Sequence, residues 1–214
     1  MLFWIGIFYL CSKQTEFMNT RQPTIEHHLL TPFLPEGARL LMLGSFPPKR
    51  ERWSMDFFYP NWINDMWRIM GLLFFNDKHY FEIGGEKRFN KELIVEFCSM
   101  NGLALYDAAS AVRRLQDNAS DKFLEVVEQI VVADLLAQLP QCRNIVTTGE
   151  KATDQVVEQF GCEKPKVGEF VAFMHEGVMI RFWRMPSSSR AYPLSLEKKA
   201  EFYRKLFRAC EILG

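Results

Sequence analysis

The chain has 214 residues, of which 48% are hydrophobic and 14% aromatic, a composition typical of a globular domain rather than of a disordered chain. Its 26 basic residues equal its 26 acidic residues, which excludes a nonspecific polycation but not a local basic surface. Five cysteines form no CxxC pair, so the sequence predicts no disulfide framework and no metal site. We expect a reduced, cytoplasmic protein that requires no cofactor.

The first 17 residues, MLFWIGIFYLCSKQTEF, contain an apolar run of about ten residues. A membrane-spanning helix needs about 20, so we expect no membrane association. The run also lacks the basic segment and small-residue cleavage site of a signal peptide, although a weak signal peptide is an alternative. We expect residues 1–17 to be an extension upstream of a true start at Met18, and residues 18–214 to form one domain.

Strands and helices alternate along the rest of the chain. Short apolar runs predict strands over residues 39–43, 103–106, 144–148 and 178–183. Helical spacing and end signals predict helices over residues 23–30, 64–75, 89–100 and 152–160, one or two helices within 121–139, and a last helix from the cap Ser195 to residue 213. This alternation predicts an α/β protein, specifically a three-layer α/β/α sandwich around a central four-stranded, mainly parallel sheet.

In such sheets a ligand binds at the carboxyl ends of the strands, which selects the loops over residues 44–63, 107–114, 148–151 and 185–194. The first of these loops begins with a rigid turn at Gly44 and Pro47-Pro48. The turn is followed by basic and then aromatic residues: Lys49, Arg50 and Arg52, then Phe57, Phe58 and Tyr59. This order suits a flat heterocycle beside a phosphate chain. Taken alone, it fits a charged surface loop with buried aromatics better.

Polar residues near strand ends leave two interpretations open. Asn64 either caps the following helix or presents a carboxamide to a water or to a base edge. Asp107 and Glu150, each just after a strand, share that ambiguity. The four histidines are scattered, and they suggest neither a hydrolase triad nor a metal site.

The last loop, RMPSSSRAYP, carries three consecutive serines, Ser187 to Ser189, between Arg184 and Arg190. Hydroxyl groups and exposed amides commonly contact phosphates and hold a duplex in register. The alternative is a solvated turn. No base that could activate a serine lies nearby in the sequence, so these residues suit binding better than nucleophilic attack.

Three motifs together, GSFPP (residues 44–48), FYPNWINDMW (58–67) and MPSSSRA (185–191), resemble the uracil-DNA glycosylase superfamily. GSFP and NDMW are most similar to its hypoxanthine branch, and MPSSS is most similar to its mismatch-specific uracil/thymine branch. GLALYDAAS and NIVTTGEKA are similar to the middle strands of the family. The resemblance covers about residues 30–210, and the order and spacing of the motifs are more specific than any one of them.

The resemblance implies a monofunctional DNA glycosylase that flips uracil or hypoxanthine out of DNA and hydrolyses its N-glycosidic bond in base excision repair. It implies a monomer whose partner is DNA with a damaged or mismatched base. Tyr59 matches the stacking position, with Phe58 as the alternate and Phe46 as a further base contact. The implied DNA contacts are Lys49, Arg50, Ser187, Ser188, Ser189 and Arg190.

Two positions depart from the family pattern. Phe46 stands where the mismatch branch has a catalytic Asn, and Met185 stands where the classical uracil enzymes have a His. Asn64 matches the active Asn of the hypoxanthine branch, so we expect catalysis by Asn64, with Ser45 and Ser187 as secondary polar contacts and with slow turnover. The alternatives are a DNA-binding protein of the same fold without activity and an unrelated small-molecule α/β enzyme.

Overall fold

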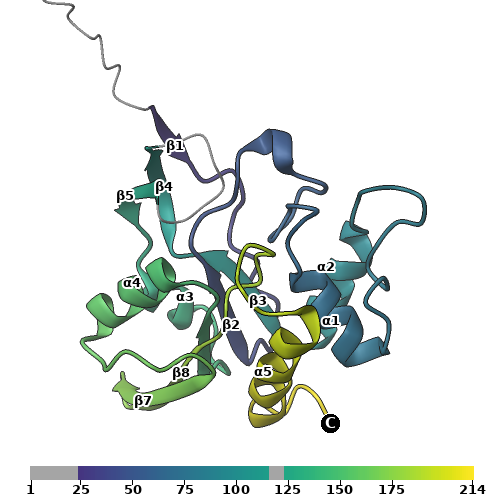
Figure 1. Ribbon diagram of the computed structural model, residues 1–214. Coiled ribbons are helices and arrows are strands. Elements are labelled where there is room, and N and C mark those ends of the chain that lie inside the picture. The colour runs from purple at the N-terminus through teal and green to yellow at the C-terminus, as the bar shows by residue number, and fades with distance from the viewer. Residues whose placement is uncertain (1–23, 116–122) are drawn as a thin grey trace, which may run out of the picture.

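A five-stranded sheet in the order β3-β2-β6-β8-β7 forms the centre of the computed structural model, which describes residues 24–115 and 123–214 (Figure 1). The predicted extension over residues 1–17 lies outside the described residues. Four strands are parallel, namely β2 (Leu40–Gly44), β3 (Leu103–Asp107), β6 (Asn144–Thr147) and β8 (Val178–Arg184). These four strands confirm the predicted strands over residues 39–43, 103–106, 144–148 and 178–183, with each end within one residue of its predicted position.

The prediction of a four-stranded sheet was wrong by one strand. β7 (Glu169–His175) pairs antiparallel with β8 at the edge of the sheet. A tight turn joins the two strands, with positive φ at Glu176 (48°) and Gly177 (77°), which is the backbone that two-residue hairpins prefer. The sequence of β7, EFVAFMH, does contain a continuous apolar run from Phe170 to Met174, so this strand could have been predicted from its local signal.

Helices lie on both sides of the sheet (Figure 1). One apolar cluster joins the sheet to α1 (Met66–Phe75), α2 (Lys91–Met100) and α5 (Leu196–Ala209). A second cluster joins the other face to α3 (Val132–Ala137) and α4 (Glu150–Phe160). Ser195 accepts a hydrogen bond from the backbone N–H of Lys198 at 3.3 Å, which confirms it as the cap of α5. Among the described residues, no helix combines the length and apolarity needed to cross a bilayer.

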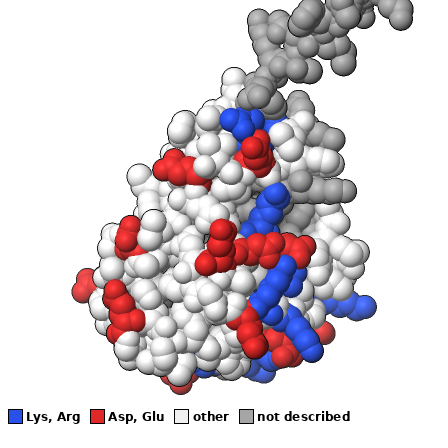
Figure 2. All heavy atoms as spheres, turned by 90° about the vertical axis from the view of Figure 1, so that its left-hand side faces the viewer, with Lys and Arg blue, Asp and Glu red and all other residues white. Residues whose placement is uncertain are grey.

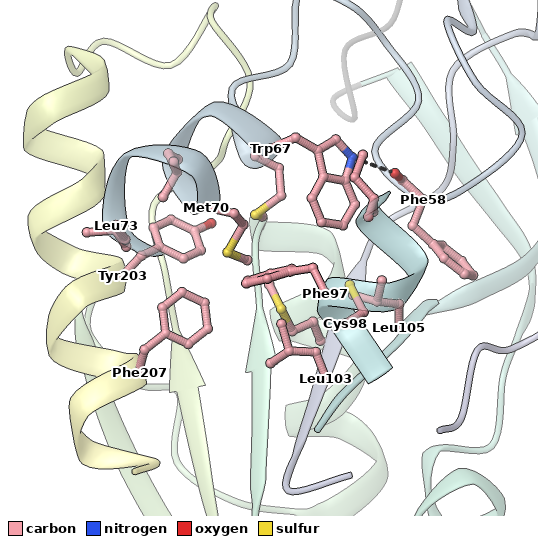
Figure 3. Packing of buried hydrophobic residues seen from close by; sticks show 14 of the residues in the cluster. Phe58, Trp67, Met70, Leu73, Phe97, Cys98, Leu103, Leu105, Tyr203 and Phe207 are labelled. Carbon is pink, nitrogen blue, oxygen red and sulfur yellow. Dashed lines mark hydrogen bonds between the residues drawn. The ribbon is translucent and has the colours of Figure 1, made fainter. Parts of the chain in front are cut away.

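Large side chains from three helices fill the first cluster (Figure 3). Tyr203 and Phe207 of α5 point toward Met70 and Leu73 of α1. Trp67, at the start of α1, donates from its indole nitrogen to the backbone oxygen of Phe58 at 3.0 Å. This buried hydrogen bond fixes the aromatic end of the first long loop to α1, so the core determines where that loop lies.

A second, antiparallel sheet of three strands contains β1 (Ile25–His27), β4 (Ala109–Arg114) and β5 (Leu124–Gln129), in the order β1-β4-β5. The predicted helix over residues 23–30 was therefore wrong. The predicted helical region 121–139 was right only for α3, and its residues 121–122 lie outside the described residues. Tertiary pairing explains the first error, because β1 gains its partner, β4, from a distant part of the chain, whereas β5 pairs with β4, the strand that directly precedes it in the sequence.

Candidate active site

A cavity of about 910 Å³ opens where the carboxyl ends of the parallel strands meet. It brings together residues from all four loops that the sequence selected. Among the predicted site residues, the lining includes Ser45, Phe46, Phe58, Tyr59, Asn64, Ser187, Ser188 and Ser189. Asp107, Thr148 and Glu150 also contribute. The volume lies in the range of small-molecule sites and is ample for a single base with its sugar.

The turn that follows β2 is fixed by a buried arginine. Arg114 of β4 donates from Nη2 to the backbone oxygen of Pro47 at 2.6 Å and from Nε to the Glu26 carboxylate at 2.9 Å. Its guanidinium lies 5.7 Å from the centre of the Phe46 ring. The second sheet thus holds the turn in place, and with it the partly buried Phe46 ring. This role of Arg114 could not be predicted from the sequence, because its partners are 67 and 88 residues away.

A buried histidine–aspartate pair lies at the edge of the cavity. His28 Nε2 and Asp107 Oδ2 are 2.8 Å apart, with the two side chains only 2% and 12% exposed. Asp107 lines the cavity, and His28 lies behind it, its ring 5.4 Å from that of Phe46. The sequence analysis missed the pair because 79 residues separate the two side chains. Among the described residues, no three His, Cys, Asp or Glu side chains are grouped as metal ligands.

Tyr59 combines an unusual backbone with a buried hydroxyl group. Its φ of 51° is in the left-handed region, which is uncommon for a residue with a large side chain. The hydroxyl lies 3.1 Å from Thr148 Oγ1, and the ring makes an edge contact with Trp67. Burial raises the pKa of Tyr59 well above its usual value of 10, and the negative charge of Asp107 raises it further. The hydroxyl therefore stays protonated and can donate.

Phe58 lies deeper than Tyr59, being only 3% exposed. Its ring packs edge-on against Phe57 and Tyr106. Phe46, Phe58 and Tyr59 thus all border the cavity, where together they give it an aromatic wall.

Asn64 lies one residue before Asp65, the N-cap of α1, and its side chain contacts the start of that helix. Its side-chain Oδ1 accepts a hydrogen bond from the backbone N–H of Met66 at 2.9 Å, which supports the first turn of α1. Asn64 also lines the cavity. Within residues 24–115 and 123–214 the side-chain Nδ2 has no hydrogen-bond partner, so this N–H₂ group is available to a ligand. The capping bond fixes the orientation of the carboxamide, since an acceptor must face the N–H group.

The serine loop is held by hydrogen bonds within the loop and by bonds from Asp65 and Lys199. Ser187 Oγ accepts from the N–H of Ser189 at 3.2 Å, and Ser189 Oγ accepts from the N–H of Ala191 at 3.3 Å. The N–H of Asp65 donates to the backbone oxygen of Ser188 at 2.9 Å. Lys199 donates to the backbone oxygen of Ser189 at 2.7 Å. The loop therefore meets the cavity as a fixed structure and not as a solvated linker.

The predicted basic contacts lie outside the cavity lining. Arg190 is about half exposed and pairs with Asp65 at 2.9 Å. Arg50, in the short helix η1 (Arg50–Arg52), pairs with Asp56 at 2.6 Å, and Lys49 is exposed beside it. On the face that carries α3 and α4, acidic side chains of the described residues are scattered widely, and the basic ones lie toward one side with acidic ones between them (Figure 2). That face offers no continuous basic surface to a phosphate backbone.

Comparison with known proteins identifies a solved structure with a similar fold. No family model matches the chain, and no curated protein sequence matches it. The chain is similar to a solved structure, a solution NMR structure of a protein from Methanosarcina acetivorans that is named a "putative uracil DNA glycosylase". The match has a TM-score of 0.59 and 20% sequence identity, and it covers 88% of this chain and 99% of the other. The two chains therefore share a mixed α/β fold over nearly their whole lengths.

Proposed function

We propose that this protein is a monofunctional DNA glycosylase of the uracil-DNA glycosylase superfamily that excises a deaminated base, uracil or hypoxanthine. The observation that carries the proposal is the cavity, because one cavity is lined by GSFPP, by the segment that ends in Asn64, and by the serine loop. The name of the similar archaeal structure supports the same class. The proposal includes the three-layer sandwich of that class and a monomer acting in the cytoplasm on damaged or mismatched DNA.

The cavity suits a base that has been flipped out of the duplex. Flipping costs a few kcal/mol, and the cost is lowest for a mispaired base. The partly buried rings of Phe46 and Tyr59 offer surface to the flat base, whereas Phe58 borders the cavity but is only 3% exposed. The serine loop borders the same opening, where its hydroxyl and amide groups can contact the phosphates on either side of the flipped nucleotide.

Cleavage of the glycosidic bond leaves positive charge on the sugar and negative charge on the departing base. Donors already oriented toward the base stabilise that negative charge without reorganising. The Nδ2 group of Asn64 is such a donor, since the bond from Met66 to Oδ1 holds the carboxamide in place. Water then attacks the sugar, and Ser45 and Ser187 supply further polar groups near the cavity opening.

A second candidate function is damage recognition without cleavage. Phe46 motivates it, because a phenylalanine cannot orient a water at the position where the mismatch branch has an asparagine. The Phe46 side chain is a hydrocarbon without any polar atom, and its ring packs against Arg114 and His28.

Excision assays on duplex and single-stranded oligonucleotides containing uracil, hypoxanthine or a G·T mismatch, followed by alkali, distinguish the two functions. We expect strand cleavage at uracil or hypoxanthine by the wild type. Asn64→Asp keeps the oxygen that accepts from Met66 but removes the N–H₂ group, so it should fold normally and lose excision by about 100-fold. Salt-sensitive binding without cleavage would favour the second function, and the absence of both binding and cleavage would reject both functions.

Asn90→Asp is the matched control. Asn90 caps α2 by accepting from the N–H of Leu93 at 3.1 Å, in the same way that Asn64 supports α1, but it lies outside the cavity lining. Its replacement makes the same chemical change at a helix start and should leave excision unchanged. Equal loss of excision in both variants would show that the effect arises from helix capping.

A further inference from the structure

A second cavity, of about 390 Å³, lies beside the serine loop, and we call it the α5 pocket. An isolated backbone bridge between Asn64 and Ser189 separates it from the first cavity. Asn64 and Ser189 line the first cavity, whereas their sequence neighbours Asp65 and Arg190 line the α5 pocket. Four side chains of the pocket are basic or become so on protonation, namely Arg68, Lys78, His79 and Arg190.

The acidic groups at the α5 pocket are already bound by the protein. Asp65 is the acidic residue of its described lining, and both of its oxygens are paired. Oδ1 accepts from Nε of Arg190 at 2.9 Å, and Oδ2 accepts from Nζ of Lys199 at 3.0 Å. The nearby Glu197 lies outside the lining, and hydrogen bonds from its own N–H and from Ser195 lower the pKa of its carboxyl. No carboxylate oxygen of the lining is therefore left for a donor.

Arg68 is fixed in place with one nitrogen left over. Its side chain is only 6% exposed. Nη1 donates to the backbone oxygens of Trp62 and Asn64 at 2.8 and 3.0 Å, and Nε pairs with Glu82 at 2.6 Å. The guanidinium also lies over the Trp62 ring, 4.4 Å from its centre. Within residues 24–115 and 123–214, Nη2 has no partner and is not fully enclosed, so this buried cation has one N–H₂ group available to a ligand.

Other nitrogen groups of the pocket are also available in the described part of the chain. Lys78 makes no ion pair or hydrogen bond there. Arg190 uses only Nε, and His79 uses Nδ1, which lies 2.8 Å from the Glu82 carboxylate and leaves Nε2 without a partner. These groups carry positive charge, or gain it on protonation, and they come from three separate segments of the chain.

The positive charges at the pocket repel one another. Burial lowers the pKa of Arg68, Glu82 opposes this effect, and the positive charge of Arg190 lowers the pKa further. The carboxylates that offset this charge are behind or beside the two guanidinium groups and are already paired. An anion held between the basic side chains would therefore relieve their repulsion.

We propose that the α5 pocket binds a phosphate group, with Nη2 of Arg68, the outer nitrogens of Arg190 and Nζ of Lys78 as its donors. Phosphate suits the pocket because it offers several acceptor oxygens to donors that arrive from different directions. Guanidinium groups bind phosphate through paired N–H groups, and an ammonium group adds a point charge. The inference goes beyond the proposed function, because the pocket is separate from the first cavity and its donors line only the pocket.

The phosphate has two sources. A backbone phosphate of DNA could reach the pocket while a base occupies the first cavity, since adjacent residues line the two openings. In that case the inference rests on the proposed function. The other source is inorganic phosphate or a phosphate monoester in solution, which needs no DNA.

A titration with inorganic phosphate tests the pocket without DNA. Sodium phosphate replaces sodium chloride at constant ionic strength, and the amide NMR signals of Lys78, His79 and Arg190 are followed. We expect saturable shifts of these signals in the wild type and at least about tenfold weaker phosphate binding in Lys78→Glu. Lys78 is exposed, so this variant should fold normally. Lys87→Glu is the matched control, because it makes the same charge change at an exposed residue outside the pocket.

Duplexes with a single neutral methylphosphonate linkage test the DNA source. The linkage is moved one position at a time along each strand, around a uracil whose 2′-fluorinated sugar resists cleavage. If the pocket holds a backbone phosphate, neutralising one linkage should weaken binding by the wild type and by Lys87→Glu by about tenfold. The same linkage should change binding by Lys78→Glu by about twofold or less, since its pocket already lacks the contact.

The inference is overturned if inorganic phosphate causes no saturable shifts and no linkage distinguishes Lys78→Glu from the wild type. An equal loss of phosphate binding in Lys78→Glu and Lys87→Glu overturns it as well. Phosphate binding without a sensitive linkage supports the inference with a free phosphate as the ligand, and a sensitive linkage supports it with DNA. Phosphate binding by a protein that excises no base supports the inference and rejects only the glycosylase activity.

Discussion

Lys199 of α5 donates a hydrogen bond to Oδ2 of Asp65 at 3.0 Å, although its side chain is completely buried. The same ammonium group donates to the backbone oxygen of Ser189 at 2.7 Å, and the other oxygen of Asp65 pairs with Arg190. A buried charge needs such partners, because an unpaired one is very unfavourable. Asp65 lies just before α1, so this network connects α1, α5 and the serine loop.

Lys199→Met should therefore destabilise the protein by about 3–5 kcal/mol, since it leaves Asp65 partly unpaired in a buried place. The serine loop should also loosen, which would weaken DNA binding more than the stability change alone explains. Urea unfolding and oligonucleotide binding measure the two effects. Lys198→Met is the control, because Lys198 is the exposed neighbour on the same helix. A loss of stability below about 1 kcal/mol would show that the pair contributes little.

Gly44→Ala tests the close contact at the end of β2. The new methyl group would lie 2.1 Å from Asp107 Oδ1, so the carboxylate must move away from its place beside His28. We expect a loss of about 1–3 kcal/mol in the free energy of unfolding and a loss of base binding. Gly84→Ala is the matched control, since no atom lies within 4 Å of its Cβ position. If Gly44→Ala binds the base normally, base binding does not depend on the present position of the Asp107 carboxylate.

The parallel strands and most helices could be predicted from the sequence because their signals are local. Short apolar runs, such as that of β2, and caps, such as Ser195, depend on neighbouring residues. The loops of the cavity followed from one topological rule, that parallel strands present their carboxyl ends at the same edge. That rule grouped the loop over residues 44–63, which ends just before Asn64, with the serines, without knowledge of any side-chain contact.

The place of β1 in the second sheet, and the side chains that this sheet brings to the site, could not be predicted, because their partners are distant in sequence. β1 was interpreted as a helix, and its pairing with β4 joins residues more than 80 positions apart. His28 and Arg114 reach the site only through this sheet and the segment after it. A histidine with no visible partner in the sequence carries no signal of its role, so the pair with Asp107 required the structure.

Arg190→Ala tests the expected phosphate contact. Arg190 is about half exposed, so the loss of its pair with Asp65 should cost less than about 1 kcal/mol of stability. Binding should weaken for all DNA sequences alike, and the slope of log Kobs against log salt should become shallower by about 1. Arg204→Ala, an exposed change on α5 away from the cavity lining, is the control. An unchanged salt slope would remove Arg190 from the DNA interface.

Tyr59 predicts a dependence of stability on alkaline pH. Its pKa is raised in the folded state because the buried hydroxyl resists ionisation. A raised folded pKa contributes stability that is complete below the unfolded value of about 10 and is lost as the pH rises through the folded value. The melting temperature should therefore fall as the pH rises above about 10, and it should fall less steeply in Tyr59→Phe.

Tyr203→Phe should also make this fall less steep, because burial also raises the pKa of Tyr203. Melting temperatures of the wild type and both variants, measured over about pH 8–11, test this dependence. If the melting temperature falls equally with pH in all three proteins, neither hydroxyl is as buried as its surroundings indicate.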